Sequence, residues 1–168
     1  VWVSANSAWI NREVWDGAPQ GKPVDTPEST FIAFDLAATR DLNAVCTLHR
    51  YSEEKFYAEL KFFLPEDSME FIPTHYKPIF MQAVDRGTLK LTQGNVADYV
   101  EIEAYIKEQT VLHNAKEIGF DAWNAAALVS KLYEQGLPVK KIGQGMAVLN
   151  NPSKHLEKLI LGKTIHHE

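Results

Sequence analysis

Two aspartates that each end a short apolar run are the residues of this chain best suited to chemistry. The first run, residues 31–34, ends in Asp35, and the second, residues 118–120, ends in Asp121. Apolar runs this short that stop in turn-like sequence predict buried strands. Carboxylates at the ends of rigid neighbouring strands suit a divalent cation, because Mg²⁺ and Mn²⁺ prefer oxygen ligands held at a fixed separation. The pair therefore indicates a metal-dependent phosphoryl-transfer enzyme.

The elements that must position these aspartates begin with a lead-in and a run of strands. Residues 1–30 are expected to be irregular, broken by prolines and glycines, apart from one short helix near residues 7–15. The tryptophans of this lead-in are expected to pack on the domain or on an upstream partner. Three strands are then predicted, at residues 30–36, 42–51 and 55–64. Because the links between them are short, neighbouring strands are expected to be antiparallel.

The second half of the chain alternates between helices and strands. The helices are predicted at residues 76–86, 97–114, 123–134 and 153–161, and the strands at residues 89–92, 117–120 and 139–142. Pro152 is expected to lie just before the last helix, and the adjacent His166 and His167 are expected to form a frayed terminus. A strand–helix–strand unit of this length implies parallel strands joined by a right-handed crossover. The predicted fold class is therefore α/β, with a mixed sheet of three antiparallel strands followed by a parallel βαβ unit, and with helices on both faces.

Composition is that of a globular domain with a real core. The chain has 168 residues, of which 45% are hydrophobic, and it has no apolar stretch long enough to span a bilayer, so no membrane partner is expected. The net charge of −5 argues against a free-standing nucleic-acid binder but not against a nuclease, because acids clustered at a metal site contribute negative charge. The single cysteine, Cys46, lies in a predicted strand and is expected to be a small core residue.

Four separated stretches of the chain resemble the motifs of one known family. They are FDLAATRDLNA at residues 34–44, TQGNVADY at residues 92–99, IGFDAWNA at residues 118–125, and a late stretch at residues 144–157. In content and order they resemble the nuclease domain of tailed-phage terminase large subunits. The predicted order of elements likewise resembles the ribonuclease H-like fold, in which the first and fourth strands lie side by side. That arrangement would bring the two aspartates together although they are far apart in the sequence.

The resemblance implies an endonuclease that cuts concatemeric double-stranded viral DNA when genome packaging starts and ends. Residues 1–30 would be a linker that follows the ATPase domain of the same large subunit, and residues 31–168 would be a C-terminally truncated nuclease domain. The chain has no phosphate-binding loop of the ATPase type, because the Gly-Gln-Gly at residues 143–145 is too short and lacks the lysine. The small terminase subunit and the portal are implied partners, and the bacterial host cytoplasm is the implied location.

The resemblance also implies hydrolysis with two Mg²⁺ or Mn²⁺ ions. Asp35 is expected to bridge both ions, and Asp121 to complete one site. Asp41, across the turn from Asp35, is expected either to bind metal or to cap backbone amides. The family supplies a third acid from a segment near its C-terminus, and the resemblance implies that the chain ends before that segment. The nearby carboxylates Glu157 and Glu168 do not match the motif, so low activity is expected of the chain in isolation.

Several further residues are candidates for contacts with DNA. Arg40 and Lys90, with Lys140 and Lys141, are candidates for phosphate contacts, and a solvated surface position without a DNA contact is the alternative for each. Trp123 follows Asp121, and it is expected to begin a helix and to pack against the wall of the site, with base stacking as its less favoured role.

Two alternatives remain open. The first is another ribonuclease H-like nuclease of the resolvase or integrase type, which would be expected to carry a more basic surface and an acid within the last helix. The second is a non-catalytic module that clamps DNA or docks on the portal with an incomplete metal site. Metal binding by the chain, and its loss when Asp35 is replaced by asparagine, would separate an enzyme from such a module.

Overall fold

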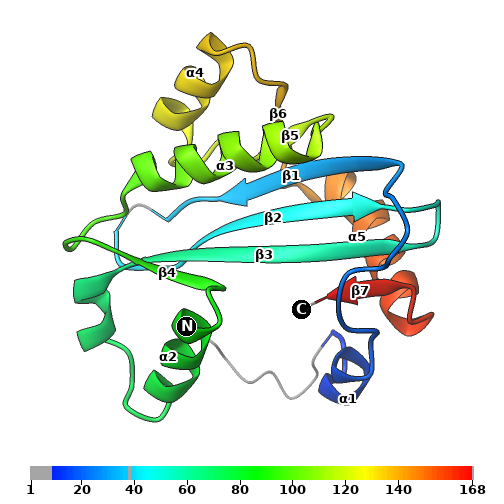
Figure 1. Ribbon diagram of the computed structural model, residues 1–168, viewed down its shortest axis with the longest axis horizontal. Coiled ribbons are helices and arrows are strands. Elements are labelled where there is room, and N and C mark those ends of the chain that lie inside the picture. The colour runs from blue at the N-terminus through cyan, green and yellow to red at the C-terminus, as the bar shows by residue number, and fades with distance from the viewer. Residues whose placement is uncertain (1–8, 38, 168) are drawn as a thin grey trace.

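The computed structural model describes residues 9–37 and 39–167. In this part of the chain a seven-stranded sheet has the order β4-β3-β2-β1-β5-β6, and β7 pairs with β3 (Figure 1). The strands are β1 (Ser29–Asp35), β2 (Asn43–Arg50), β3 (Phe56–Pro65), β4 (Leu89–Thr92), β5 (Ile118–Phe120), β6 (Val139–Lys141) and β7 (Ile165–His167). The helices are α1 (Arg12–Asp16), a 3-10 helix (Glu66–Glu70), α2 (Lys77–Asp85), α3 (Tyr99–His113), α4 (Ala126–Glu134) and α5 (Met146–Leu161).

The first three strands form the antiparallel ribbon that the sequence predicts. β1 pairs antiparallel with β2, with Asp35 opposite Ala44, and β2 pairs antiparallel with β3, with Asn43 opposite Phe63. Side chains of β2 alternate between fully and partly buried positions, as expected for a central strand covered unequally on its two faces. The predicted strand boundaries differ from the observed ones by one residue at each end.

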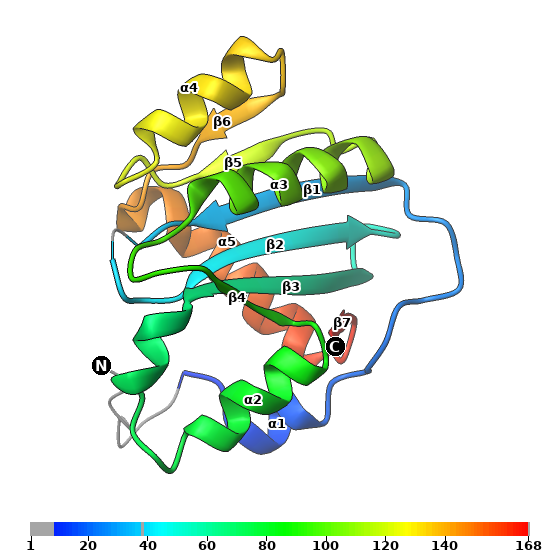
Figure 2. The ribbon, with the colours of Figure 1, turned by 60° about the vertical axis from the view of Figure 1, so that its left-hand side comes forward.

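The remaining strands of the main sheet are parallel. β5 pairs parallel with β1 and β6 pairs parallel with β5, so their carboxyl ends meet at the same edge of the sheet. In Figure 2, α3 lies in front of the sheet and α5 lies behind it. The predicted fold class, a mixed sheet with helices on both faces, is confirmed.

The main core fills the space between the sheet and the pair α3 and α4. The helix α3 buries Ile102, Ile106 and Thr110, which recur every fourth residue and so form one face of the helix. From the sheet and from α4 this core takes Ile32, Phe34, Val45, Phe63, Ile118, Leu128 and Leu132. A smaller cluster on the opposite face joins α5 to β3 and β7.

Burial raises the pKa of the Cys46 thiol to about 11, with Glu59 adding to the effect, which agrees with a structural role for this cysteine.

The N-cap of α3 provides a test of how this helix is stabilised. The side chain of Asp98 accepts a hydrogen bond of 2.9 Å from the N–H of Val100. We expect Asp98→Ala to lower the free energy of unfolding by about 1 kcal/mol, because an end N–H of the helix loses its acceptor. Asp98→Asn keeps the acceptor and should retain most of the stability in urea denaturation. Equal losses in both variants would show that the negative charge stabilises the helix and that the hydrogen bond does not.

Two helices in the second half of the chain begin at other residues than expected. The helix α5 begins at Met146, well before Pro152, because the carbonyl of Gly145 accepts the N–H groups of Val148 and Leu149 and closes a first turn. Proline is then tolerated inside the helix at the loss of one backbone hydrogen bond. The helix α4 begins at Ala126 rather than at residue 123.

The expected frayed terminus is also wrong. His166 and His167 belong to β7, which pairs parallel with β3. His167 is buried, its N–H donates to the carbonyl of Pro19, and its ring stacks on Trp15 with the ring centroids 4.5 Å apart. The expected packing of a lead-in tryptophan on the domain is therefore observed for Trp15, whereas Trp2 lies outside the described residues.

A buried histidine in β2 gives the fold a dependence on pH. His49 is fully buried, its Nδ1 lies 2.9 Å from Thr30 Oγ1, and its ring meets His113 edge-on. Burial, together with the positive charge of Lys22 and the nearby His113, lowers the pKa of His49 from 6.5 to about 4. Between these pH values the unfolded chain binds a proton that the folded chain does not.

We therefore expect stability to fall as the pH drops from about 6.5 towards 4, by up to about 1.4 kcal/mol per pH unit. Urea denaturation at several pH values in this window measures the slope. His49→Gln should reduce the slope and leave the part that His113 contributes, because burial also lowers the pKa of His113. His75→Gln, which replaces an exposed histidine, should leave the slope as in the wild type. An unchanged slope in His49→Gln would assign the pH dependence to other groups.

Candidate metal centre

The parallel pairing of β1 and β5 brings the two aspartates together. Ile32 lies opposite Ile118, and Phe34 lies opposite Phe120. The same register, continued by one residue, sets Asp35 beside Asp121. Side chains alternate along a strand, so both aspartates lie on the sheet face opposite the main core. The expected juxtaposition is thus produced by the sheet itself.

A small cavity of about 170 Å³ contains both carboxylate-bearing residues. Its lining is Ala33, Phe34, Asp35, Gly119, Phe120, Asp121, Ile142 and Gln144. Gly119 is required for its shape, since a Cβ at this position would lie 2.5 Å from the Cδ1 atom of Ile142. The side chain of Ile142 therefore packs directly on the backbone of Gly119, and a side chain at position 119 would displace it.

The residues that precede the aspartates fix the two strands on the other face. The rings of Phe34 and Phe120 are stacked, with their centroids 6.0 Å apart and their planes within 14°. Phe34 is buried in the main core. Because each ring belongs to the residue directly before an aspartate, this contact limits relative movement of Asp35 and Asp121.

Three side chains hold the turn that follows Asp35. The fully buried Asn43 accepts the N–H of Ala37 at 2.9 Å and donates to the carbonyl of Asp41 at 3.4 Å. Tyr99 donates its hydroxyl to the carbonyl of Ala37 at 3.1 Å, and Asn124 donates to the carbonyl of Leu36 at 3.4 Å. The backbone leaving Asp35 is thereby tied to β2, α3 and the loop after β5.

The turn that follows Asp121 presents a large aromatic side chain to solvent. The Oδ1 atom of Asp121 accepts the N–H of Trp123 at 3.3 Å, and Asn124 adopts the left-handed conformation at φ 59°. The exposed fraction of Trp123 is 76%. The expectation that Trp123 begins the helix and packs against the site wall is therefore wrong, because this tight turn delays the helix until Ala126.

The chemistry of the cavity fits a cation. Neither Asp35 nor Asp121 forms a salt bridge with a lysine or arginine of the described residues. Two adjacent carboxylates without an internal counter-charge are stabilised by a bound cation, and their hard oxygens suit Mg²⁺ or Mn²⁺. Within residues 9–37 and 39–167, however, no group of three acidic, histidine or cysteine side chains is arranged to hold a metal. These two ligands thus leave most of the coordination sphere to water or substrate.

The other predicted site residues lie away from the cavity lining. Asp41 is exposed in the turn after β1, where its carbonyl is bound by Asn43. The guanidinium of Arg40 lies 4.1 Å from the ring centroid of Phe71. Lys90 forms an ion pair of 2.6 Å with Glu101 of α3, and the strand register places it on the face opposite Asp35.

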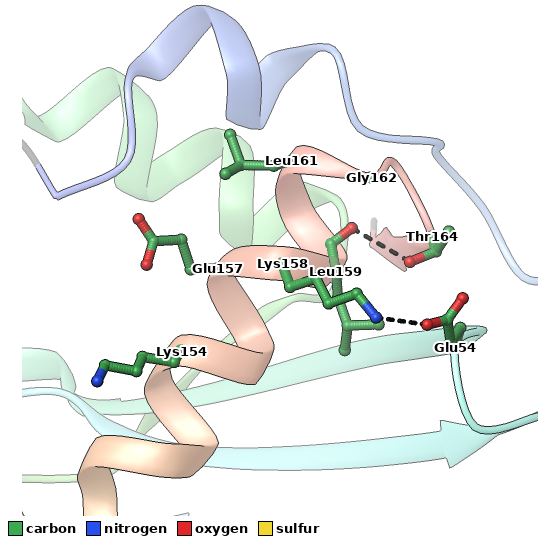
Figure 3. A pocket seen from close by; sticks show the side chains of 8 residues that line it. All are labelled: Glu54, Lys154, Glu157, Lys158, Leu159, Leu161, Gly162 and Thr164. Carbon is green, nitrogen blue, oxygen red and sulfur yellow. Dashed lines mark hydrogen bonds and ion pairs between the residues drawn. The ribbon is translucent and has the colours of Figure 1, made fainter.

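Glu157, a candidate for the third acid, lines a different and larger cavity. This cavity of about 530 Å³ lies between the end of α5 and the turn that joins β2 to β3 (Figure 3). An ion pair of 2.5 Å joins Lys158 to Glu54 across it, and the hydrogen bond from Lys158 lowers the pKa of Glu54. Glu168 lies outside the described residues.

Sequence reasoning missed the residues that shape the site without carrying charge. Asn43, Tyr99 and Asn124 bond to backbone groups, and Gln144 lines the cavity. All four lie in stretches that resemble family motifs, at residues 34–44, 92–99, 118–125 and 144–157. The resemblance gave them no role, and their hydrogen bonds are recognisable only once the strands are assembled.

A mixed sheet of this order, with an acid at the end of each of two adjacent parallel strands, defines a ribonuclease H-like domain. Residues 1–168 match the family model of the terminase large subunit, endonuclease domain. The chain belongs to this family.

Relatives agree with this assignment. The large terminase subunit of Enterobacteria phage HK97 is 26% identical over 167 residues, which are 98% of this chain and 33% of the relative. The crystal structure of the HK97 bacteriophage large terminase superposes on this chain with a TM-score of 0.82 at 25% sequence identity. The superposed region is 96% of this chain and 34% of the HK97 chain. The chain thus spans about a third of the length of the curated relative it matches.

More distant structures share the fold. Two crystal structures of the large terminase nuclease from thermophilic phage G20c, one with bound zinc and one with bound magnesium, each have a TM-score of 0.53 at 13% identity. Each superposed region is 92% of this chain; it is 80% of the zinc-bound chain and 72% of the magnesium-bound chain. At this identity the likeness concerns the fold alone.

Proposed function

We propose that this chain is the catalytic part of a metal-dependent endonuclease that cuts concatemeric double-stranded viral DNA during genome packaging. The observation that carries the proposal is the side-by-side placement of Asp35 and Asp121 in a small cavity with no internal counter-charge. Membership of the terminase endonuclease family supports it. The bound magnesium of the G20c nuclease supports the choice of a divalent cation.

The carboxylates of the site would act by holding divalent cations at fixed positions. Asp35 would bridge two divalent ions and Asp121 would complete one of the two sites, with Asp41 as a further ligand, directly or through water. When bound, the ions would activate a water molecule for attack on the phosphorus and stabilise charge on the leaving oxygen. The turn held by Asn43, Tyr99 and Asn124 would keep the Asp35 carboxylate in position before substrate arrives. The amide of Gln144 would face the substrate from the loop after β6.

The partners follow from the same assignment. An ATPase domain in the same large subunit would feed DNA to this domain, and the small terminase subunit and the portal would complete the packaging machine in the host cytoplasm. Arg40 would contact a phosphate after exchanging its present partner, Phe71. Lys90 is paired with Glu101 on the opposite face of the sheet, so it would not reach a phosphate held at the aspartates. None of the described helices is long and apolar enough to cross a membrane.

Supercoiled plasmid provides the test. We expect nicking or linearisation in the presence of Mn²⁺ or Mg²⁺ and none when the metal is removed with EDTA. Cleavage that persists in EDTA would contradict the proposal. Binding of Mn²⁺ by the chain, measured by calorimetry, gives a second readout that does not require turnover.

One observation favours a second candidate function. The described residues contain two carboxylates at the cavity and no third ligand, which is also what a DNA-clamping or portal-docking module with an incomplete metal site would have. Such a module would bind DNA or portal equally well with Asp35 and with Asn at this position, and it would not bind Mn²⁺.

A further inference from the structure

Trp123 is a large apolar side chain held in water beside the aspartate cavity. Its exposed fraction is 76%, although tryptophan is among the residues that gain most from burial. The backbone around it is nevertheless fixed, since its own N–H donates to Asp121, Asn124 bonds to the carbonyl of Leu36, and Ala125 is 1% exposed. Exposed aromatic residues on anchored loops at a site are typical of binding surfaces.

The first residue of α5 adds a second exposed apolar side chain near the same edge of the sheet. Met146 lies two residues after the cavity-lining Gln144, and its exposed fraction is 85%. The loop that carries Trp123 and the loop that leads to Met146 leave the carboxyl ends of adjacent parallel strands, β5 and β6. The edge that holds the two carboxylates is therefore also apolar.

The position of Trp123 matters if a phosphodiester is bound at the aspartates, so this inference rests on the proposed function. A phosphate held at Asp35 and Asp121 brings the nucleosides on either side of it to the edge of the sheet where Trp123 lies. Bases offer an apolar face on which an aromatic side chain can stack. In a duplex the next base covers this face, so an aromatic side chain can stack on a base only if two neighbouring base pairs are first unstacked.

We propose that Trp123 is a DNA-contacting residue that wedges into the duplex and stacks on a base next to the scissile phosphate. The stacking would fix the register of the backbone over the carboxylates, and the opened step would bring the phosphate closer to the cavity. Because opening a step is cheapest where stacking is weak, Trp123 would also give the nuclease a preference for deformable or mismatched steps.

Cleavage of two substrates by Trp123→Ala tests the proposal. Cleavage of a duplex of about 30 base pairs would require Trp123 to open a base step, whereas bis(p-nitrophenyl) phosphate has no base step to open and reports cleavage at the metal centre. We expect duplex cleavage to fall by about tenfold, within the range for losing one base–aromatic stack, and ester cleavage to stay within about twofold. Trp123→Phe should restore most of the duplex activity, and a central mismatch should accelerate the wild type more than Trp123→Ala.

Tyr133→Ala is the matched control, since Tyr133 is 73% exposed at the far end of α4 and its loss should affect neither substrate. Duplex cleavage by Trp123→Ala at the rate of the wild type would overturn the proposal. An equal loss on both substrates would also overturn it, because Trp123 would then support the metal centre and not the DNA.

A fluorescence readout separates this inference from the proposed nuclease activity. Stacking on a base should quench Trp123, so the quenching caused by adding duplex DNA in Ca²⁺ should be smaller in Trp123→Phe than in the wild type. If the wild type cleaves neither substrate, the proposed activity fails while this comparison still decides the role of Trp123. Identical DNA-induced quenching in both proteins would overturn the wedge.

Discussion

Asp35→Asn is expected to remove metal-dependent DNA cleavage almost completely, by about three orders of magnitude, equivalent to about 4 kcal/mol of transition-state stabilisation. An amide is neutral and presents one oxygen, so it cannot bridge two cations as a carboxylate does. The measurement is the initial rate of plasmid nicking in Mn²⁺, together with calorimetric titration of Mn²⁺ in the absence of DNA. The variant should fold as well as the wild type, because the exposed Asp35 side chain has no salt bridge to lose among the described residues.

Asp121→Asn should lower the cleavage rate less, by about a hundredfold, because in the proposed centre Asp121 would hold one ion and Asp35 two. Its amide oxygen still accepts the N–H of Trp123, so the turn should survive. Asp85→Asn at the exposed end of α2 is the matched control and should retain full activity. Undiminished Mn²⁺ binding in both site variants would place the metal elsewhere and would contradict the proposed centre.

The strand ends that carry the aspartates were predictable because each aspartate ends a short apolar run, which is a short-range pattern. The strand–helix–strand unit makes β5 and β6 parallel, but it does not place β1 beside β5. The antiparallel ribbon was predictable for the same reason, since its alternation and short links are local. The resemblance to terminase nucleases added which strands are neighbours, and this is the information that joins Asp35 to Asp121.

The features that escaped prediction depend on contacts between distant segments. β7 has three residues and no pattern of its own, and it is a strand because β3 offers an edge to it and Pro19 accepts the N–H of His167. The early start of α5 depends on Gly145 and overrides the usual preference for proline in a first turn. Trp123 was misplaced because apolar residues are usually buried, and the turn fixed by Asp121 and Asn124 keeps this one in solvent.

Asn43 illustrates how much of a site can depend on a residue without charge. It is fully buried on β2, and its side chain joins the N–H of Ala37 to the carbonyl of Asp41. Its two hydrogen bonds therefore close the turn whose ends are Asp35 and Asp41. A turn of this kind, left open, would let the Asp35 carboxylate sample positions that do not bind metal.

Asn43→Ala is accordingly expected to lower the free energy of unfolding by about 2 kcal/mol, since it leaves backbone groups without partners inside the protein. It should also weaken Mn²⁺ binding by about tenfold or more, as is usual when a residue that orients a metal ligand is removed. The binding measurement is made at a temperature where circular dichroism shows the variant fully folded, so that loss of stability and loss of affinity are measured separately.

Thr47→Val is the matched control for Asn43→Ala. Thr47 lies on the same strand and the same face and is equally buried, but its hydroxyl has no hydrogen-bond partner among the described residues. Replacing it with the isosteric valine should leave stability unchanged or raise it, and should leave Mn²⁺ affinity unchanged. If Asn43→Ala loses stability but binds Mn²⁺ as tightly as Thr47→Val, the turn supports only the fold. If affinity falls in Asn43→Ala alone, the buried amide of Asn43 sets the geometry of the Asp35 carboxylate through the turn that it closes.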